Sequence, residues 1–305
     1  MEFNNFTELI RDKVAEQVGN DYQVHLNNVR KNNGIKLTAL TVLQEDNNIS
    51  PAIYLNDYHE KYVNGRETLD SIVNQILDAY NENKIDPNIN LGCILNYEGA
   101  KPRIIFKLVN TEKNKELLEN VPHIDFLDLS IVFQCMVLQE EFEISTFLIH
   151  DVHRKMWNVS VEDLYRVAME NTPKLLTCEI KSMAETICDI VQSEDITDEE
   201  LGKIMRQFAG SIPMFVMSNR CRVEGASCML YPNILASFAQ SISSSFYIIP
   251  ASIHELLLIP AQQYIEDKSI KSMIREINDT QVSDEEILSY SLYFYDKEEG
   301  KIVRR

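Results

Sequence analysis

The stretch from residue 212 to residue 260 constrains the fold of this chain more than any other. It is the densest apolar segment of the sequence, and Asn, Gly and Pro divide it into runs of strand length. Between these runs, Ile234, Leu235, Phe238 and Ile242 recur at helical spacing. The pattern predicts a strand-strand-helix-strand-strand core, with strands at 214–217, 226–230, 246–249 and 256–259.

The same stretch contains an unusual group of polar residues: Asn219, Ser252, His254 and Glu255. A histidine beside a carboxylate can be held in one tautomer and act as a general base. His254 and Glu255 are therefore the catalytic candidates, and Asn219 and Ser252 are candidates for binding. The alternative is that these side chains satisfy backbone groups at a hairpin bend. His123, which precedes an apolar run, is a further binding candidate with the same alternative.

The N-terminal part of the chain has the pattern of a small, separate α/β unit. Asn33-Gly34 lies between two apolar runs and predicts a β-hairpin. An amphipathic helix is expected over 69–80, and the polar, aperiodic segment 81–90 follows it. These features predict a small unit at 1–85 and a larger body at 86–305.

The body has the pattern of an α+β protein built from antiparallel hairpins that helices cover. Strands are expected at 103–109, 126–138 and 141–149. Capping boxes at 160–163 and 197–200 predict helix starts, and Pro173 is expected to end the first of these helices. Hairpin-length connections outnumber the crossover helices that a parallel sheet would need, which favours an antiparallel arrangement.

Charge and composition exclude several classes of partner. The formal net charge of −18 disfavours nucleic acid and anionic membrane surfaces, because both require a basic footprint. The sequence has no basic, apolar leader and no apolar run long enough to span a bilayer, so a soluble, cytoplasmic protein is expected. The six cysteines are scattered and form no C-x-x-C pair, which indicates reduced thiols and not a zinc site.

Motifs that would identify an enzyme are missing from the sequence. There is no G-x-S-x-G elbow, Walker loop or dinucleotide fingerprint, and no cofactor is expected. His150-x-x-His153 places two imidazoles at helical spacing, but no carboxylate partner follows at a useful distance. Two surface histidines at a helix start are the preferred interpretation, and no metal site is predicted.

Several segments resemble the blocks of a bacterial family known as domain of unknown function 5688. They are Asn33-Gly34, SPAIYLNDYHEKYVNG (50–65), VPHIDFLDLSIVF (121–133), ENTPKLL (170–176), PMFVMSN (213–219), GASCMLYP (225–232) and PASIHELLLIP (250–260). The blocks keep their order over nearly the whole chain. The resemblance implies an intracellular bacterial protein of one family-length unit, and it implies no activity, cofactor or catalytic residue.

Two functional hypotheses follow. In the first, the protein is a non-enzymatic cytoplasmic accessory or protein-interaction module that binds a protein partner or itself. This hypothesis predicts an exposed apolar or aromatic patch larger than roughly a few hundred Å². In the second, it is a hydrolase-like enzyme with a His/carboxylate site around His254 and Glu255. That hypothesis predicts a pocket in which a third polar group lies within hydrogen-bond reach of these two residues.

Overall fold

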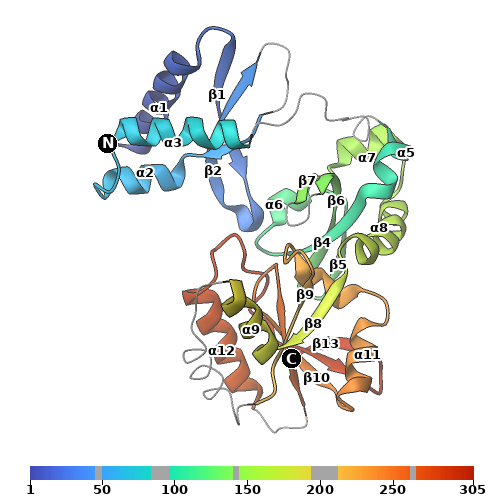
Figure 1. Ribbon diagram of the computed structural model, residues 1–305. Helices are drawn as coiled ribbons and strands as arrows, with labels where there is room; N and C mark the ends of the chain where they lie inside the picture. Colours follow the sequence, from blue (N-terminus) through green and yellow to red (C-terminus); the bar gives the residue numbers. More distant parts are fainter. Residues whose placement is uncertain (45–49, 84–95, 140–143, 194–211, 262–265) are drawn as a thin grey trace. The chain divides into compact units, whose positions relative to one another are not determined.

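The computed structural model describes residues 1–44, 50–83, 96–139, 144–193, 212–261 and 266–305. The chain forms two compact units, Met1–Asn90 and Leu91–Arg305 (Figure 1). Each unit has its own buried apolar core within the described residues. The two units are therefore described separately.

The first unit is an antiparallel sheet with helices on one face. Its strands β1 (Tyr22–Arg30), β2 (Lys36–Gln44) and β3 (Ile53–Tyr54) lie in the order β1-β2-β3. The 3-10 turn η1 (Asn32–Gly34) joins β1 to β2 at the predicted Asn-Gly hairpin. The helices are α1 (Phe3–Val18), α2 (Asn56–Val63) and α3 (Leu69–Glu82).

Periodicity explains why this unit folds as it does. Phe6, Ile10 and Val14 form one stripe of α1, and Ile72 and Ile76 form the matching stripe of α3. These side chains pack with alternate residues of β2, including Leu40 and Val42, in one core. The side chain of Thr68 caps α3 by accepting a hydrogen bond from the Ser71 N–H.

The second unit contains two sheets. In the first, β6 (Leu129–Gln139) pairs on one side with β4 (Ile104–Asn110) and on the other with β5 (His123–Phe126) and β7 (Ile144–Leu148). All pairings are antiparallel. The helical segments around this sheet are α5 (Tyr97–Ala100), η2 (Lys101–Arg103), α6 (Lys115–Leu118), α7 (Asp151–Trp157) and α8 (Val161–Leu175).

The second sheet has the order β13-β12-β10-β11-β9-β8 among the described strands. Its strands are β8 (Cys178–Ser182), β9 (Phe215–Asn219), β10 (Phe246–Pro250), β11 (Leu256–Pro260), β12 (Tyr293–Asp296) and β13 (Lys301–Arg304). The associated helices are α9 (Met183–Ser193), η3 (Gly225–Leu230), α11 (Ile234–Ser241) and α12 (Asp267–Thr280).

Both faces of the two central strands of this sheet are buried. Phe246, Ile248 and Leu258 belong to a core shared with α8, α11 and the first sheet. Their neighbours Ile249 and Leu257 point the other way and pack with apolar residues of α12. Burial on two faces removes the usual alternation of polar and apolar residues, which explains the dense apolar run in the sequence.

The predicted α+β class, with antiparallel hairpins and helices, is confirmed. One strand of the expected C-terminal core is wrong, however, because residues 226–230 form the 3-10 helix η3. This segment is buried, and Gly225 packs against Ser218 and the backbone of His254. The Ala226 N–H donates to the Ile253 carbonyl, which ties the start of η3 to the β10–β11 turn instead of a sheet.

Two further expectations are corrected. The apolar run 126–138 is not one strand, because Leu127 adopts a left-handed backbone conformation and the chain turns there between β5 and β6. Pro173 does not end α8, which continues to Leu175. The proline lies in the last turn, so the backbone hydrogen bond that it removes is at the end of the helix and α8 finishes two residues later.

The capping box at 197–200 lies outside the described residues. The one at 160–163 is confirmed, since Ser160 Oγ accepts from the Asp163 N–H and the Asp163 carboxylate accepts from the Ser160 N–H. Of the described helices, none combines the length and apolar character needed to cross a membrane.

Candidate functional site

Two of the four polar residues singled out in 212–260, Asn219 and His254, contact one loop of the second unit. β9 pairs with β11, so the end of β9 at Asn219 lies beside the β10–β11 turn that contains His254. The loop at 220–224 follows β9 and is hydrogen-bonded to both Asn219 and His254. Two of its residues, Arg222 and Glu224, have φ of 54°, which is uncommon for residues other than glycine.

The Asn219 side chain makes two hydrogen bonds to this loop. Its Nδ2 donates to the Val223 carbonyl at 2.6 Å, and its Oδ1 accepts from the Val223 N–H at 3.3 Å. The residue is buried. Because both ends of its amide are used within the loop, these contacts fit a positioning role for the Asn219 side chain.

The His254 ring is hydrogen-bonded to the same loop. Its Nδ1 accepts a hydrogen bond of 3.0 Å from the Glu224 N–H, so the neutral ring carries its proton on Nε2. Nε2 lies 3.4 Å from the Glu286 carboxylate. With one nitrogen accepting from the backbone and the other facing a carboxylate, the ring in this state has no lone pair directed at a substrate.

Ser252 and Glu255 contribute to the turn mainly through short-range contacts. Ser252 Oγ accepts from the His254 N–H at 2.9 Å, and the Ser252 N–H donates to the Glu255 carbonyl at 3.1 Å. The Glu255 carboxylate has no hydrogen bond or ion pair within the described ranges. The carboxylate facing His254 belongs to Glu286, which the sequence did not single out.

His123 lies on β5, and its Nδ1 donates to the Val121 carbonyl at 2.8 Å. Within the described part of the chain, no recorded hydrogen bond or ring contact joins it to His254. The distant polar residues therefore converge in part. Asn219 and His254 contact one loop, Ser252 contacts His254 within the adjacent turn, and His123 has its own local partner.

Sequence reasoning missed a partly buried ionic group beside this loop. Glu224 Oε1 accepts from Lys107 Nζ at 2.7 Å and from Gln134 Nε2 at 3.3 Å. Lys107 and Gln134 come from β4 and β6, so this group links the first sheet to the loop. A signal existed, because each is an isolated polar residue inside an apolar strand, in IIFKLV and IVFQCM.

His150 and His153 form the start of α7. The His150 N–H donates to His153 Nδ1 at 3.0 Å, and the His153 ring stacks on Trp157. Burial, together with the nearby His150, lowers the pKa of His153 below its usual value. These contacts make the pair a helix cap. Among the described residues, no group of three or more His, Cys, Asp and Glu side chains is placed to hold a metal ion.

A second polar centre that the sequence did not reveal lies at Asp128, in the β5–β6 turn. Its carboxylate accepts hydrogen bonds from Ser289, Ser291 and Tyr293, at 2.6, 2.9 and 2.9 Å. Burial and the nearby Asp128 charge raise the pKa of Tyr293, so its hydroxyl stays protonated and continues to donate. Asp128 thus ties the turn to a segment more than 160 positions away.

Two exposed apolar or aromatic residues flank this centre. Leu127 precedes Asp128 and is 45% exposed, and Tyr290 lies between Ser289 and Ser291 and is 40% exposed. Lys113 Nζ lies 5.5 Å from the centre of the Tyr290 ring. We call Lys113, Leu127 and Tyr290 the Asp128 surface.

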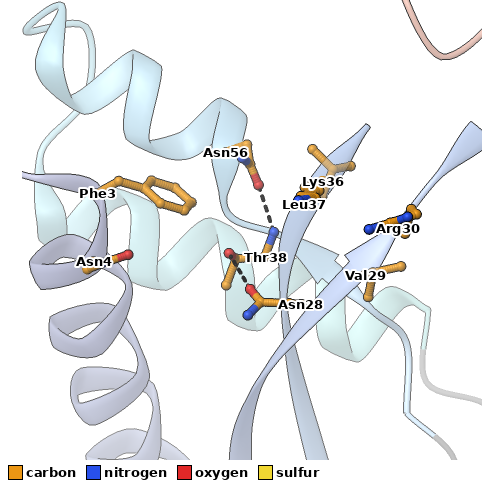
Figure 2. A pocket seen from close by; sticks show the side chains of 9 residues that line it. All are labelled: Phe3, Asn4, Asn28, Val29, Arg30, Lys36, Leu37, Thr38 and Asn56. Carbon is orange, nitrogen blue, oxygen red and sulfur yellow. Dashed lines mark hydrogen bonds between the residues drawn. The ribbon is translucent and has the colours of Figure 1, made fainter. Parts of the chain in front are cut away.

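The first unit has a pocket of about 610 Å³ (Figure 2). It lies where the starts of α1 and α2 meet the hairpin end of β1 and β2. Its lining residues are Phe3, Asn4, Asn28, Val29, Arg30, Lys36, Leu37, Thr38 and Asn56. The sequence had indicated the hairpin but not the pocket, which depends on helices and strands that are distant along the chain.

Comparison with known proteins identifies the family of the chain. No curated protein and no solved structure matches it. The model of one family, described as a family of unknown function (DUF5688), matches residues 3–297. Because the match covers nearly the whole sequence, the chain belongs to the DUF5688 family.

Proposed function

We propose that the protein is a non-enzymatic accessory protein, a protein-interaction module whose Asp128 surface binds another protein. One observation carries the proposal: Leu127 is both exposed and in the left-handed backbone region, with φ of 57°. The left-handed conformation costs a residue with a Cβ about 1–2 kcal/mol, and glycine or asparagine adopts it more easily.

Leucine at this position therefore gives the isolated protein neither a relaxed backbone nor a fully buried side chain. Backbone strain of this kind persists where the surroundings impose it, and it clusters at functional sites. Here the hydrogen bonds of Asp128 to Ser289 and Ser291 hold the turn in place. An apolar side chain presented on a rigid turn loses little entropy when a partner buries it.

The chemistry of the Asp128 surface specifies the partner. Leu127 and Tyr290 supply apolar and aromatic contact, and Tyr and other aromatic residues are enriched at the centres of protein interfaces. Lys113 is exposed and supplies a positive charge beside the Tyr290 ring. The Asp279 carboxylate accepts a hydrogen bond of 2.8 Å from the Tyr290 hydroxyl, so both signs of charge lie at this surface. We therefore infer a partner segment that presents an apolar side chain.

The alternative, a hydrolase-like enzyme using His254 and Glu255, has less support. Both ring nitrogens of His254 face protein groups, and Glu286, not Glu255, lies opposite Nε2. A base at this position would first have to release one of these contacts. The net charge of −18 agrees with another part of the proposal, that neither nucleic acid nor an anionic membrane is a partner. A cytoplasmic location is also part of the proposal.

The test uses Leu127→Asn. Asparagine tolerates the left-handed region, so the variant should gain about 1 kcal/mol in unfolding free energy, measured by urea denaturation. After crosslinking in native cell extract, the same variant should retain at least about tenfold less of the partner protein than the wild type does. This is the loss expected when a side chain at the centre of an interface is removed.

The matched control is Val152→Asn, which removes another exposed apolar side chain, on α7. It should retain the partner as the wild type does. Equal retention by both variants contradicts the proposal. Sedimentation velocity provides a second check, because self-association that Leu127→Asn abolishes would mean that the surface binds another copy of this chain.

A further inference from the structure

The pocket of the first unit carries an inference that is independent of the Asp128 surface, which lies in the second unit. None of the nine residues that line it is acidic, and two are basic. The whole chain, in contrast, has 47 Asp and Glu against 29 Lys and Arg. The lining of the pocket therefore has a net positive charge, although the whole chain is strongly acidic.

The two basic residues face each other across the hairpin. Arg30 on β1 pairs directly with Lys36 on β2. Like charges at directly opposed positions of neighbouring strands destabilise a sheet. Lys36 makes no recorded ion pair within the described residues. An anion bound at Lys36 would therefore offset the positive charge that this side chain brings next to Arg30.

Hydrogen bonds within the pocket orient two amide groups as donors. The Asn56 Oδ1 accepts from the Thr38 N–H at 3.0 Å, and the Asn28 Oδ1 accepts from Thr38 Oγ1 at 3.3 Å (Figure 2). Because both carbonyl oxygens are occupied, the NH₂ groups of Asn28 and Asn56 remain as donors. With Lys36, the pocket offers several donors to an acceptor-rich ligand.

The pocket also has an apolar side. Phe3 from the start of α1 lies opposite the hairpin strands (Figure 2). Its volume of about 610 Å³ is within the range of pockets that hold small organic molecules. A ligand with an oxyanion and a flat apolar part would use both sides.

We propose that this pocket binds a small organic oxyanion, through a carboxylate or a phosphate group held by Arg30, Lys36 and the amides of Asn28 and Asn56. The apolar part of the ligand packs against Phe3. The overall charge of −18 opposes large polyanions, so the ligand is a small molecule. Carboxylate and phosphate share the required chemistry, since both present several acceptors and negative charge.

Isothermal titration calorimetry on the full chain tests the proposal with four probes: phenyl phosphate, inorganic phosphate, phenylacetate and acetate. At least one aromatic probe should bind, and it should bind more tightly than the matching anion without the ring. Which of the two aromatic probes binds better identifies the anionic group. No binding of any aromatic probe at millimolar concentration overturns the proposal.

Affinities of single-residue variants test whether the probe binds in this pocket. Lys36→Ala should weaken the best probe by about tenfold, the loss expected for a charge-assisted hydrogen bond. Asn28→Ala should weaken it a few-fold. Lys115→Ala, which removes the same charge from an exposed position on α6, should leave the affinity unchanged. Equal affinity in the wild type and Lys36→Ala overturns the assignment to this pocket.

Discussion

At the scale of single residues, the loop beside His254 depends on one close approach. A Cβ on Gly225 would lie 2.7 Å from the Asn219 backbone nitrogen, and closer still to Ser218 Oγ and the His254 carbonyl oxygen. Two of these three atoms belong to the backbone and cannot rotate away. Glycine is therefore required where β9, the loop and the β10–β11 turn meet.

Gly225→Ala should consequently lower the free energy of unfolding by about 3 kcal/mol or more, because it overpacks a rigid site. Gly65→Ala is the control. Gly65 has φ of 67° but no atom within 4 Å of an added Cβ, so only backbone strain of about 1–2 kcal/mol is expected. Urea denaturation of both variants measures the difference. Equal losses would show that the close approach at Gly225 costs nothing.

At the scale of elements, α7 begins with a cap that depends on a neutral imidazole. His153 Nδ1 accepts the His150 N–H, which a protonated ring cannot do. Burial and the neighbouring His150 place the folded pKa of His153 below the unfolded value of 6.5. The folded state therefore binds this proton more weakly than the unfolded state.

The sign of the pH effect follows from linkage. The contribution of His153 to stability is fully present above pH 6.5 and is lost as the pH falls from there toward the folded pKa. His153→Asn replaces the ring with an acceptor that does not titrate. Relative to this variant, the wild type should lose unfolding free energy as the pH falls below about 6.5. A constant difference between the two proteins would contradict the role of His153.

At the scale of the whole molecule, the chain has two compact units, Met1–Asn90 and Leu91–Arg305. The core of the first combines α1, α3 and its own sheet, and the cores of the second combine both of its sheets with α8, α11 and α12. The domain limits at 1–85 and 86–305 remain a prediction about independent folding.

Expressing residues 1–90 and 91–305 separately tests that prediction. Each fragment should unfold cooperatively, since each retains the core clusters described for its unit. Circular dichroism during thermal denaturation measures this, and the full chain is the control. A fragment without a cooperative transition would mean that its unit needs the rest of the chain to fold.

Local pattern determined most of the elements in advance. The Asn33-Gly34 turn, the stripe of α3, the Ser160 cap and the strands β9, β10 and β11 were predicted correctly. Each depends on interactions between residues close in sequence or on a regular apolar period. The exceptions were 226–230, Leu127 and Pro173, where contacts with distant segments or the end of a helix outweighed the local signal.

The sequence by itself determined the α+β class, the antiparallel hairpins and the acidic surface, because hydrophobic period, turn residues and charge are properties of short segments or sums over the chain. Only the tertiary structure decided which polar groups meet. Glu286 opposite His254, Ser289 on Asp128 and Asn56 beside Thr38 are pairs from distant segments. Such pairs form when strands and helices pack, so no spacing along one chain could indicate them.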